Sequence, residues 1–123
     1  MTKVLVAEDD KYLSQAYKLK LSKSGFEVRM AGDGDEVLMI LNDFSPDVIL
    51  LDLVMPNRDG FATLEEIKKN EAWKKIPVIV ASNLGQAEDI EKATKLGAID
   101  FVVKSDLSME SLLKKIEKTV GSG

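Results

Sequence analysis

The sequence predicts an α/β fold, a doubly wound five-stranded parallel sheet with helices on both faces. Short apolar runs alternate with longer segments of helical periodicity five times along the chain. Most of these runs are apolar at consecutive positions, which is typical of strands that are covered on both faces, as in parallel sheets. Strands and helices that alternate in this way pack as a layered fold with right-handed crossovers.

The five expected strands are residues 4–7, 26–31, 48–51, 78–81 and 99–103. The second run differs from the others, because Phe26, Val28 and Met30 alternate with charged residues. Alternation of this kind indicates a strand with one exposed face. We therefore expect residues 26–31 to lie at an edge of the sheet.

The five segments between and after these strands carry apolar residues at spacings of three and four, which predicts a helix in each. Gly25 ends the first helix and Gly97 the fourth, Ser45-Pro46 ends the second, and Ser108 is the expected N-cap of the fifth. We assign all five apolar stripes to the core. The stripes are Leu13, Ala16, Tyr17 and Leu21; Val37, Leu38, Ile40, Leu41 and Phe44; Phe61, Leu64 and Ile67; Ala87, Ile90, Ala93 and Thr94; and Leu112, Leu113, Ile116 and Val120.

Length and composition limit the classes of function. The 123 residues suit one domain, and their lack of cysteine and histidine excludes disulfides, thiol chemistry and Ser-His-Asp catalysis. A formal net charge of −4 argues against direct nucleic-acid binding by this domain. No apolar run approaches the ~18 residues of a membrane span, so we expect a cytoplasmic protein without membrane contact.

Polar side chains stand where the strands are expected to end. Glu8 and Asp9 follow the first strand, Asp52 the third, Ser82 the fourth and Lys104 the fifth. The carboxyl ends of parallel strands share one edge, and ligands bind there at the point where strand order reverses. For the strand order 2-1-3-4-5 this point lies between the first and third strands. The three carboxylates should therefore converge in the binding crevice.

Three carboxylates in one crevice repel each other and need a cation. Oxygen ligands without histidine or cysteine favour a hard ion, Mg²⁺ before Ca²⁺ or a transition metal. Lys104 adds a second positive charge that can neutralise a phosphoryl oxygen, and Ser82 can donate its hydroxyl. Aspartate is a known nucleophile in phosphoryl transfer, so Asp52 is the candidate phosphoryl acceptor.

Taken singly, each of these residues also has a purely structural explanation. An acidic residue after a strand often caps the following helix, as we expect for Asp10. Asp52 fits a turn, Ser82 the start of a loop, and Lys104 an ordinary surface position. The joint pattern favours function, because four separate strand ends carry the residue types that phosphoryl chemistry requires.

Around these residues the chain resembles the receiver domain of two-component response regulators. The resemblance implies a flavodoxin-like (βα)5 fold, with residues 1–120 as the receiver domain. The composition of Gly121-Ser122-Gly123 indicates that residues 121–123 form a flexible tail. The matching segments, in family order and spacing, are residues 4–10, 46–56 with Asp59-Gly60, 76–82 and 97–104.

The resemblance implies roles for the residues of the acidic edge. Asp52 corresponds to the phosphoacceptor, and Glu8 and Asp9 to the acidic pair that places Mg²⁺, Asp9 directly and Glu8 through water. The backbone carbonyl of Val54 corresponds to the family's third protein ligand.

The resemblance also implies a response and a partner. Ser82 corresponds to the hydroxyl residue that moves toward the phosphoryl group, Lys104 to the lysine that contacts it, and Phe101 to an aromatic switch residue. A histidine kinase or phosphotransfer protein would supply the phosphoryl group from its own histidine. Such a domain is not an enzyme in the usual sense, because it catalyses only its own phosphorylation and dephosphorylation.

The chain departs from the family pattern after Lys104, where Ser105 stands in place of a proline that usually follows a cis bond. A cis bond before another residue costs about 3–4 kcal/mol, so we expect either a trans bond or a strained cis bond here. Val54 and Leu84 are apolar positions beside the site. Neither side chain can orient an attacking water, which predicts slow self-dephosphorylation.

The fourth and fifth helices and the last strand form the family's usual output face, toward an effector domain or protein partner. Mixed charges there can support a dimer through ion pairs, but exposed pairs contribute only about 0–1 kcal/mol each. Lys114 and Ile90 differ from the residues common in the transcription-factor subfamily, so we expect a monomer or a weak homodimer. The charged residues are Glu88, Asp89, Glu91, Lys92, Lys95, Asp100, Glu110 and Lys114.

Three other functions compete with this interpretation. A phosphohydrolase with an aspartate nucleophile typically has a second aspartate two residues later, where this chain has Val54. A flavodoxin-like binding module would have a Ser/Thr/Gly-rich phosphate loop where Glu8-Asp9-Asp10 stands. A degenerate receiver that acts without phosphorylation would lack the aspartate or the lysine, and this chain has both Asp52 and Lys104.

Overall fold

The computed structural model describes residues 1–106 and 108–121. It is a three-layer α/β structure with a five-stranded parallel sheet in the order β2-β1-β3-β4-β5, which confirms the predicted fold class and strand order. The elements are β1 (Lys3–Ala7), α1 (Lys11–Lys23), β2 (Glu27–Ala31), α2 (Gly34–Leu41), β3 (Val48–Leu51), α3 (Gly60–Lys69), β4 (Val78–Ser82), α4 (Ala87–Lys95), β5 (Asp100–Val103), the 3-10 turn η1 (Lys104–Asp106) and α5 (Met109–Gly121).

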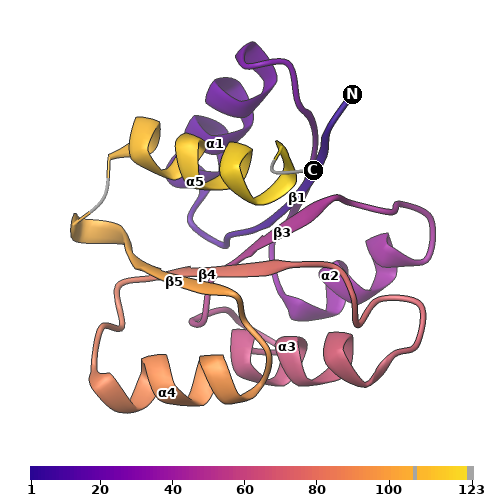
Figure 1. Ribbon diagram of the computed structural model, residues 1–123, viewed down its shortest axis with the longest axis vertical. Coiled ribbons are helices and arrows are strands. Elements are labelled where there is room, and N and C mark those ends of the chain that lie inside the picture. The colour runs from indigo at the N-terminus through magenta and orange to yellow at the C-terminus, as the bar shows by residue number, and fades with distance from the viewer. Residues whose placement is uncertain (107, 122–123) are drawn as a thin grey trace.

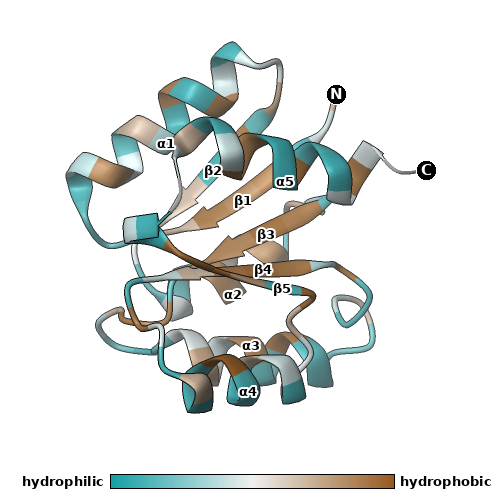
Figure 2. Cartoon of the chain, turned by 60° about the vertical axis from the view of Figure 1, so that its left-hand side comes forward, coloured by the Kyte–Doolittle hydropathy of each residue, from teal (hydrophilic) through white to brown (hydrophobic). Residues whose placement is uncertain are grey.

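Helices cover both faces of the sheet. Helices α1 and α5 lie on one face, and α2, α3 and α4 lie on the other (Figure 1). In β3, Ile49 and Leu51 pack toward α2, α3 and α4, while Val48 and Leu50 pack toward α1 and α5. A strand between two helical layers buries every side chain, and this explains the continuous apolar runs (Figure 2).

The expected edge strand and three of the expected helix boundaries are also confirmed. The predicted end of the second helix at Ser45-Pro46 is wrong, because α2 already ends at Leu41 with Asn42 as its C-cap. Strand β2 pairs only with β1, and its charged residues are exposed. Gly25 has φ 93° and Gly97 has φ 110°, the left-handed conformation that glycine adopts most readily after a helix. The backbone N–H of Ser111 donates to Ser108 Oγ (3.1 Å), as expected of an N-cap at Ser108.

Several boundaries differ from the sequence prediction. Phe26 lies outside β2 because its N–H donates to the carbonyl of Leu21 (3.1 Å) and closes the end of α1. Phe44 lies beyond the end of α2, although its side chain is buried as predicted. Helix α5 extends through Gly121, the first residue of the expected tail, while residues 122 and 123 lie outside the described residues.

Within the described residues, no helix combines the length and the apolar composition that crossing a bilayer requires.

The start of α3 packs directly against the end of β3. Gly60 donates its N–H to the carbonyl of Leu53 (2.9 Å), and Asp59 caps the helix by accepting the N–H of Ala62 (2.8 Å). A Cβ at Gly60 would lie 2.2 Å from the Asp52 carbonyl oxygen and 2.6 Å from the Leu53 Cα. This close approach requires glycine and brings α3 against the backbone of Asp52.

We predict that Gly60→Ala destabilises the fold by about 1–3 kcal/mol, because the added methyl group meets backbone that cannot rotate away. Urea unfolding followed by circular dichroism measures the loss. The matched control is Gly121→Ala, where a Cβ meets no atom within 4 Å and the change should stay within about 0.5 kcal/mol. Equal stability of Gly60→Ala and the parent protein would contradict the packing argument.

Candidate functional site

A hollow of about 240 Å³ lies at the carboxyl edge of the sheet. All seven residues that the sequence placed at or near this edge line it: Glu8, Asp9, Asp52, Val54, Ser82, Leu84 and Lys104. Asp10, Leu13 and Asn83 complete its lining. The hollow lies where strand order reverses between β1 and β3, as expected of a ligand site in an open α/β sheet.

Three carboxylates converge in this hollow. One oxygen each from Glu8, Asp9 and Asp52 lies within 4.8 Å of the other two. Glu8 and Asp52 are buried, whereas Asp9 is exposed. An all-oxygen cluster that opens to solvent on one side can hold a metal ion.

Lys104 links two of these carboxylates. Its Nζ donates to Asp52 Oδ2 (3.0 Å) and to Glu8 Oε1, and its side chain is 12% exposed. One ammonium thus faces three carboxylates, which leaves the cluster with an excess of negative charge. That excess favours binding of a further cation.

Burial and ion pairing have opposite effects on the pKa values of Glu8 and Lys104. Burial raises the pKa of Glu8, although the hydrogen bond from Lys104 opposes the rise. Burial by itself lowers the pKa of Lys104, but its hydrogen bonds to Glu8 and Asp52 outweigh this effect and raise that pKa above the usual value. Lys104 is therefore charged at neutral pH and remains a cation within reach of Asp52.

Backbone hydrogen bonds hold the acidic strand ends in place. The N–H of Asp52 donates to the carbonyl of Ala7 (3.1 Å), which ties the end of β3 to the end of β1. The N–H of Val54 donates to Asp52 Oδ1 (3.3 Å), and the N–H of Asp10 donates to Glu8 Oε2 (3.1 Å). The two buried carboxylates are thus oriented by the chain that follows each of them.

Asp10 has a capping function. Its Oδ1 accepts the N–H groups of Tyr12 (2.8 Å) and Leu13 (3.0 Å) at the start of α1. It does not belong to the group of three converging carboxylates. The expectation that Asp10 is a helix N-cap is therefore confirmed.

Ser82 and Phe101 lie on adjacent strands near the site. Ser82 is buried at the end of β4, and its Oγ accepts the N–H of Leu84 (3.2 Å). Phe101 is partly buried in β5 and packs against the core on the side of α2, α3 and α4. A switch role for either residue stays a prediction.

The bond between Lys104 and Ser105 is trans, like every other peptide bond in the described residues. Lys104 and Ser105 begin the turn η1, so the chain leaves β5 as a short helical turn. Of the two alternatives for this bond, the structure has the trans form.

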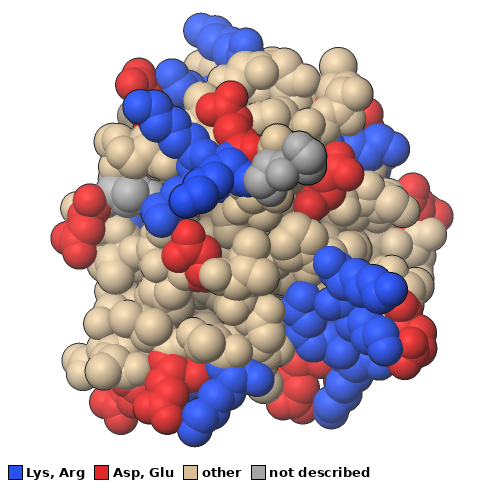
Figure 3. Space-filling view, viewed as in Figure 1, with Lys and Arg blue, Asp and Glu red and all other residues tan. Residues whose placement is uncertain are grey.

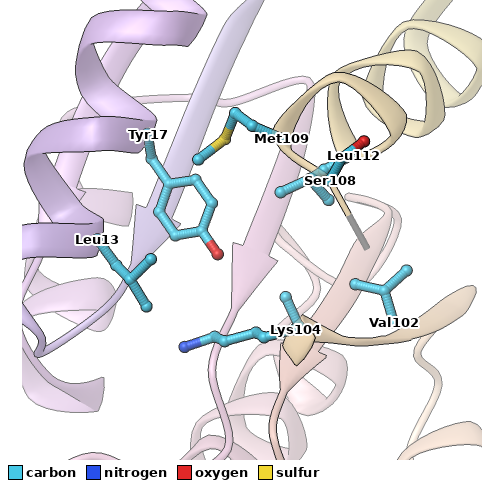
Figure 4. Close-up of a pocket in the computed structure, with 8 residues that line it drawn as sticks. Leu13, Tyr17, Val102, Lys104, Ser108, Met109 and Leu112 are labelled. Atoms are coloured by element: carbon cyan, nitrogen blue, oxygen red, sulfur yellow. The ribbon is translucent and has the colours of Figure 1, made fainter. Parts of the chain in front are cut away.

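A second, smaller cavity of about 80 Å³ lies behind Lys104, between α1, α5 and the ends of β4 and β5. The hydroxyl of Tyr17 points toward the Lys104 side chain in this cavity (Figure 4). Burial raises the pKa of Tyr17. The helical periodicity of the sequence predicted Tyr17 only as part of the core stripe of its helix, and no local motif marks it as a neighbour of the site.

The face formed by α4, β5 and α5 carries charges of both signs (Figure 3). Many of them pair within the chain, as in Lys115 with Asp100 (3.1 Å) and Lys95 with Glu91 (2.9 Å). Ion pairs that already form inside one molecule contribute less to pairing between two molecules. This reduces the support for a dimer held by these charges.

The chain matches a known family over most of its length. A sequence model of the response regulator receiver domain matches residues 4–117. The receiver domain of the Francisella response regulator 1452 is 33% identical, with a TM-score of 0.91, and the match covers 99% of this chain and 98% of that one. The chemotaxis response regulator CheY4 of Vibrio cholerae is 28% identical, with a TM-score of 0.89, and 97% and 98% of the two chains are covered.

Curated relatives are longer than this chain. The DNA-binding dual master transcriptional regulator RpaA of Synechocystis is 30% identical over 94% of this chain and 48% of its own length. Protein-glutamate methylesterase/protein-glutamine glutaminase 3 of Rhodospirillum rubrum is 39% identical over 98% of this chain and 32% of its own length. The chain thus spans about half or less of the first curated relatives that it matches.

The match extends through every strand of the sheet and includes each residue of the carboxylate and lysine cluster. The chain belongs to the response regulator receiver domain family of two-component systems.

Proposed function

We propose that this chain is a phosphoacceptor switch in which Asp52 receives a phosphoryl group, in a Mg²⁺-dependent transfer, from a histidine kinase or phosphotransfer protein. The observation that carries the proposal is the contact of Lys104 with both Asp52 and Glu8 in a hollow open to solvent. A nucleophile, a fixed cation and a metal-binding set of oxygens are then within a few ångströms of each other. Phosphoryl transfer needs little more than this, because it depends mainly on positioning and charge neutralisation.

The donor set of the hollow fits Mg²⁺. Glu8, Asp9 and Asp52 offer only carboxylate oxygens, and one side of the cluster is open to water and phosphate oxygens. These residues would hold the ion, with the backbone carbonyl of Val54 as a further ligand. Bound there, Mg²⁺ would neutralise the carboxylates and lower the repulsion of an incoming phosphoryl group.

The chain's own residues would then carry out the transfer. An oxygen of Asp52 attacks the phosphorus, a P–O bond forms, and the P–N bond to the donor histidine breaks, its electron pair staying on the imidazole nitrogen. Lys104 Nζ lies 3.0 Å from Asp52 Oδ2, close enough to pair with an oxygen of the phosphoryl group. Ser82 would donate a hydrogen bond from its hydroxyl to another oxygen of the phosphoryl group and would thereby respond to phosphorylation.

On this proposal residues 1–120 form the receiver domain, which catalyses only its own phosphorylation and dephosphorylation. The esterase named among the relatives carries its activity in a protein of which this chain spans 32%. Movement of Ser82 and Phe101 would alter the α4-β5-α5 face, toward an effector domain or a protein partner. The domain would act in the cytoplasm, as a monomer or a weak homodimer.

The expectation of no nucleic-acid contact needs a correction. RpaA is named as DNA-binding, and this chain spans 48% of it. The net charge of −4 argues only against direct binding by the receiver domain. A longer protein that contains this domain can therefore still act on DNA.

Phosphorylation at Asp52 is tested with acetyl phosphate and Mg²⁺ by intact-mass spectrometry. We expect a gain of one phosphoryl group that disappears in Asp52→Asn, because the amide is not a nucleophile toward phosphorus. Asp47→Asn, a change of the same chemistry at an exposed position, should leave the gain intact. No gain in the parent protein, or a gain that persists in Asp52→Asn, would refute the proposal.

Mg²⁺ binding is tested by the thermal midpoint of unfolding. At about ten times the Kd, binding to the native state alone adds about 1.4 kcal/mol of stability, which raises Tm by about 5 °C. Asp9→Asn should lose most of this rise. Asp10→Asn is the matched control and should keep it, because asparagine is an equally good N-cap; equal responses of the two variants would count against Asp9 as a ligand.

Val54→Asn should shorten the lifetime of the acyl phosphate several-fold, because an amide can orient a water molecule toward the phosphorus. The Val54 side chain is 58% exposed beside Asp52, so the replacement should leave the fold intact. The decay of the phosphorylated mass over time gives the rate. Leu19→Asn, at an exposed apolar position of α1, should decay like the parent; an unchanged or slower rate in Val54→Asn would contradict the prediction.

A further inference from the structure

The loop that follows Asp52 is fastened to the start of α2. Asn57 Nδ2 donates to Asp33 Oδ2 (2.6 Å), Arg58 Nε donates to Asp35 Oδ1 (2.8 Å), and the N–H of Gly34 donates to the carbonyl of Arg58 (3.1 Å). We call residues 53–59 the acceptor loop. These contacts join it to a segment more than twenty residues earlier in the chain.

Asn57 is suited to this place in two ways. Its backbone is left-handed, with φ 64°, a conformation that asparagine tolerates better than most residues other than glycine. Its side chain makes the shortest of the three contacts, and the acceptor is a carboxylate, which strengthens the hydrogen bond.

Asp33 has a partner on each carboxylate oxygen. Oδ1 accepts the N–H of Glu36 and caps α2 (2.9 Å), while Oδ2 accepts from Asn57. The hydrogen bond from the Glu36 N–H, and then that from Asn57, lower the pKa of Asp33. The side chain that accepts the hydrogen bond from Asn57 is therefore the charged carboxylate of Asp33, which is itself held by the N-terminus of α2.

The other end of the acceptor loop reaches the site. Val54 lines the hollow beside Asp9 and Asp52, and its N–H donates to Asp52 Oδ1 (3.3 Å). Only two residues separate Val54 from Asn57, so a shift at Asn57 moves the backbone at Val54. The exposed ion pair of Arg58 with Asp35 adds little restraint by itself, because such pairs contribute about 0–1 kcal/mol.

We propose that the hydrogen bond between Asn57 and Asp33 positions the acceptor loop for metal binding. It holds the Val54 backbone toward Asp52 and thereby raises the affinity of the site for Mg²⁺. Asn57 and Asp33 are positioning residues, because neither contacts the carboxylate cluster. The inference rests on the proposed Mg²⁺ site and adds two residues that the family resemblance did not supply.

Two single variants remove the contact and spare the local backbone. Asn57→Gly deletes the side chain and keeps the left-handed conformation easy to adopt. Asp33→Ser keeps an oxygen that can cap α2 but is too short to reach Asn57. Titration calorimetry with MgCl₂ should show a Kd about tenfold higher for each variant, as is typical when a contact that supports metal ligands is lost.

A control separates positioning from stability. Asn70 is the C-cap residue of α3, at the end of the helix away from the acceptor loop, and its Oδ1 accepts the N–H of Ala72 (2.8 Å). Asn70→Ala also removes a loop hydrogen bond, so it should lower stability toward urea but leave the Kd for Mg²⁺ unchanged.

The double variant Asn57→Gly/Asp33→Ser decides whether the two residues act through one contact. Its Kd should equal that of either single variant; independent, multiplying losses would overturn the inference. An unchanged Kd in Asn57→Gly, with normal Mg²⁺ binding by the parent protein, would also overturn it and leave the proposed function standing. Absence of Mg²⁺ binding in the parent protein would instead refute the metal site itself.

Discussion

The charge balance around Lys104 is the constraint on which the site depends. Two buried carboxylates, Glu8 and Asp52, share its ammonium at the carboxyl edge of the sheet. An unpaired charge at this depth would be costly, whereas three carboxylates with one ammonium stay electrostatically unsatisfied and favour a further cation. The arrangement thus pairs the buried charges and leaves the net negative charge that the proposed Mg²⁺ site would use.

Close packing surrounds Asp52 on several sides. Strands β1 and β3 fix its backbone, and the start of α3 packs so closely at Gly60 that a methyl group would not fit. The acceptor loop lies between these two points and is fastened to α2 through Asn57. The backbone around Asp52 therefore has few ways to yield, as the proposed switch would require.

Family membership and site geometry support the same function from independent directions. Sequence and structural relatives identify a receiver domain, while the carboxylates and the lysine have the arrangement that Mg²⁺-assisted phosphoryl transfer requires. The curated relatives are longer and bear different activities in their names. One receiver domain is thus compatible with several outputs, since function depends on the site and on what is attached to it.

The fold class, the strand order and the residues of the acidic edge could all be predicted from the sequence. Apolar periodicity is set by near neighbours along the chain, and the ends of parallel strands must meet at one edge. The three-dimensional structure was needed to show that Lys104 lies between Glu8 and Asp52 and that the bond before Ser105 is trans. It also decided the contact of Asn57 with Asp33, 24 residues apart. Such contacts depend on side-chain reach and loop path between distant segments, which no local pattern encodes.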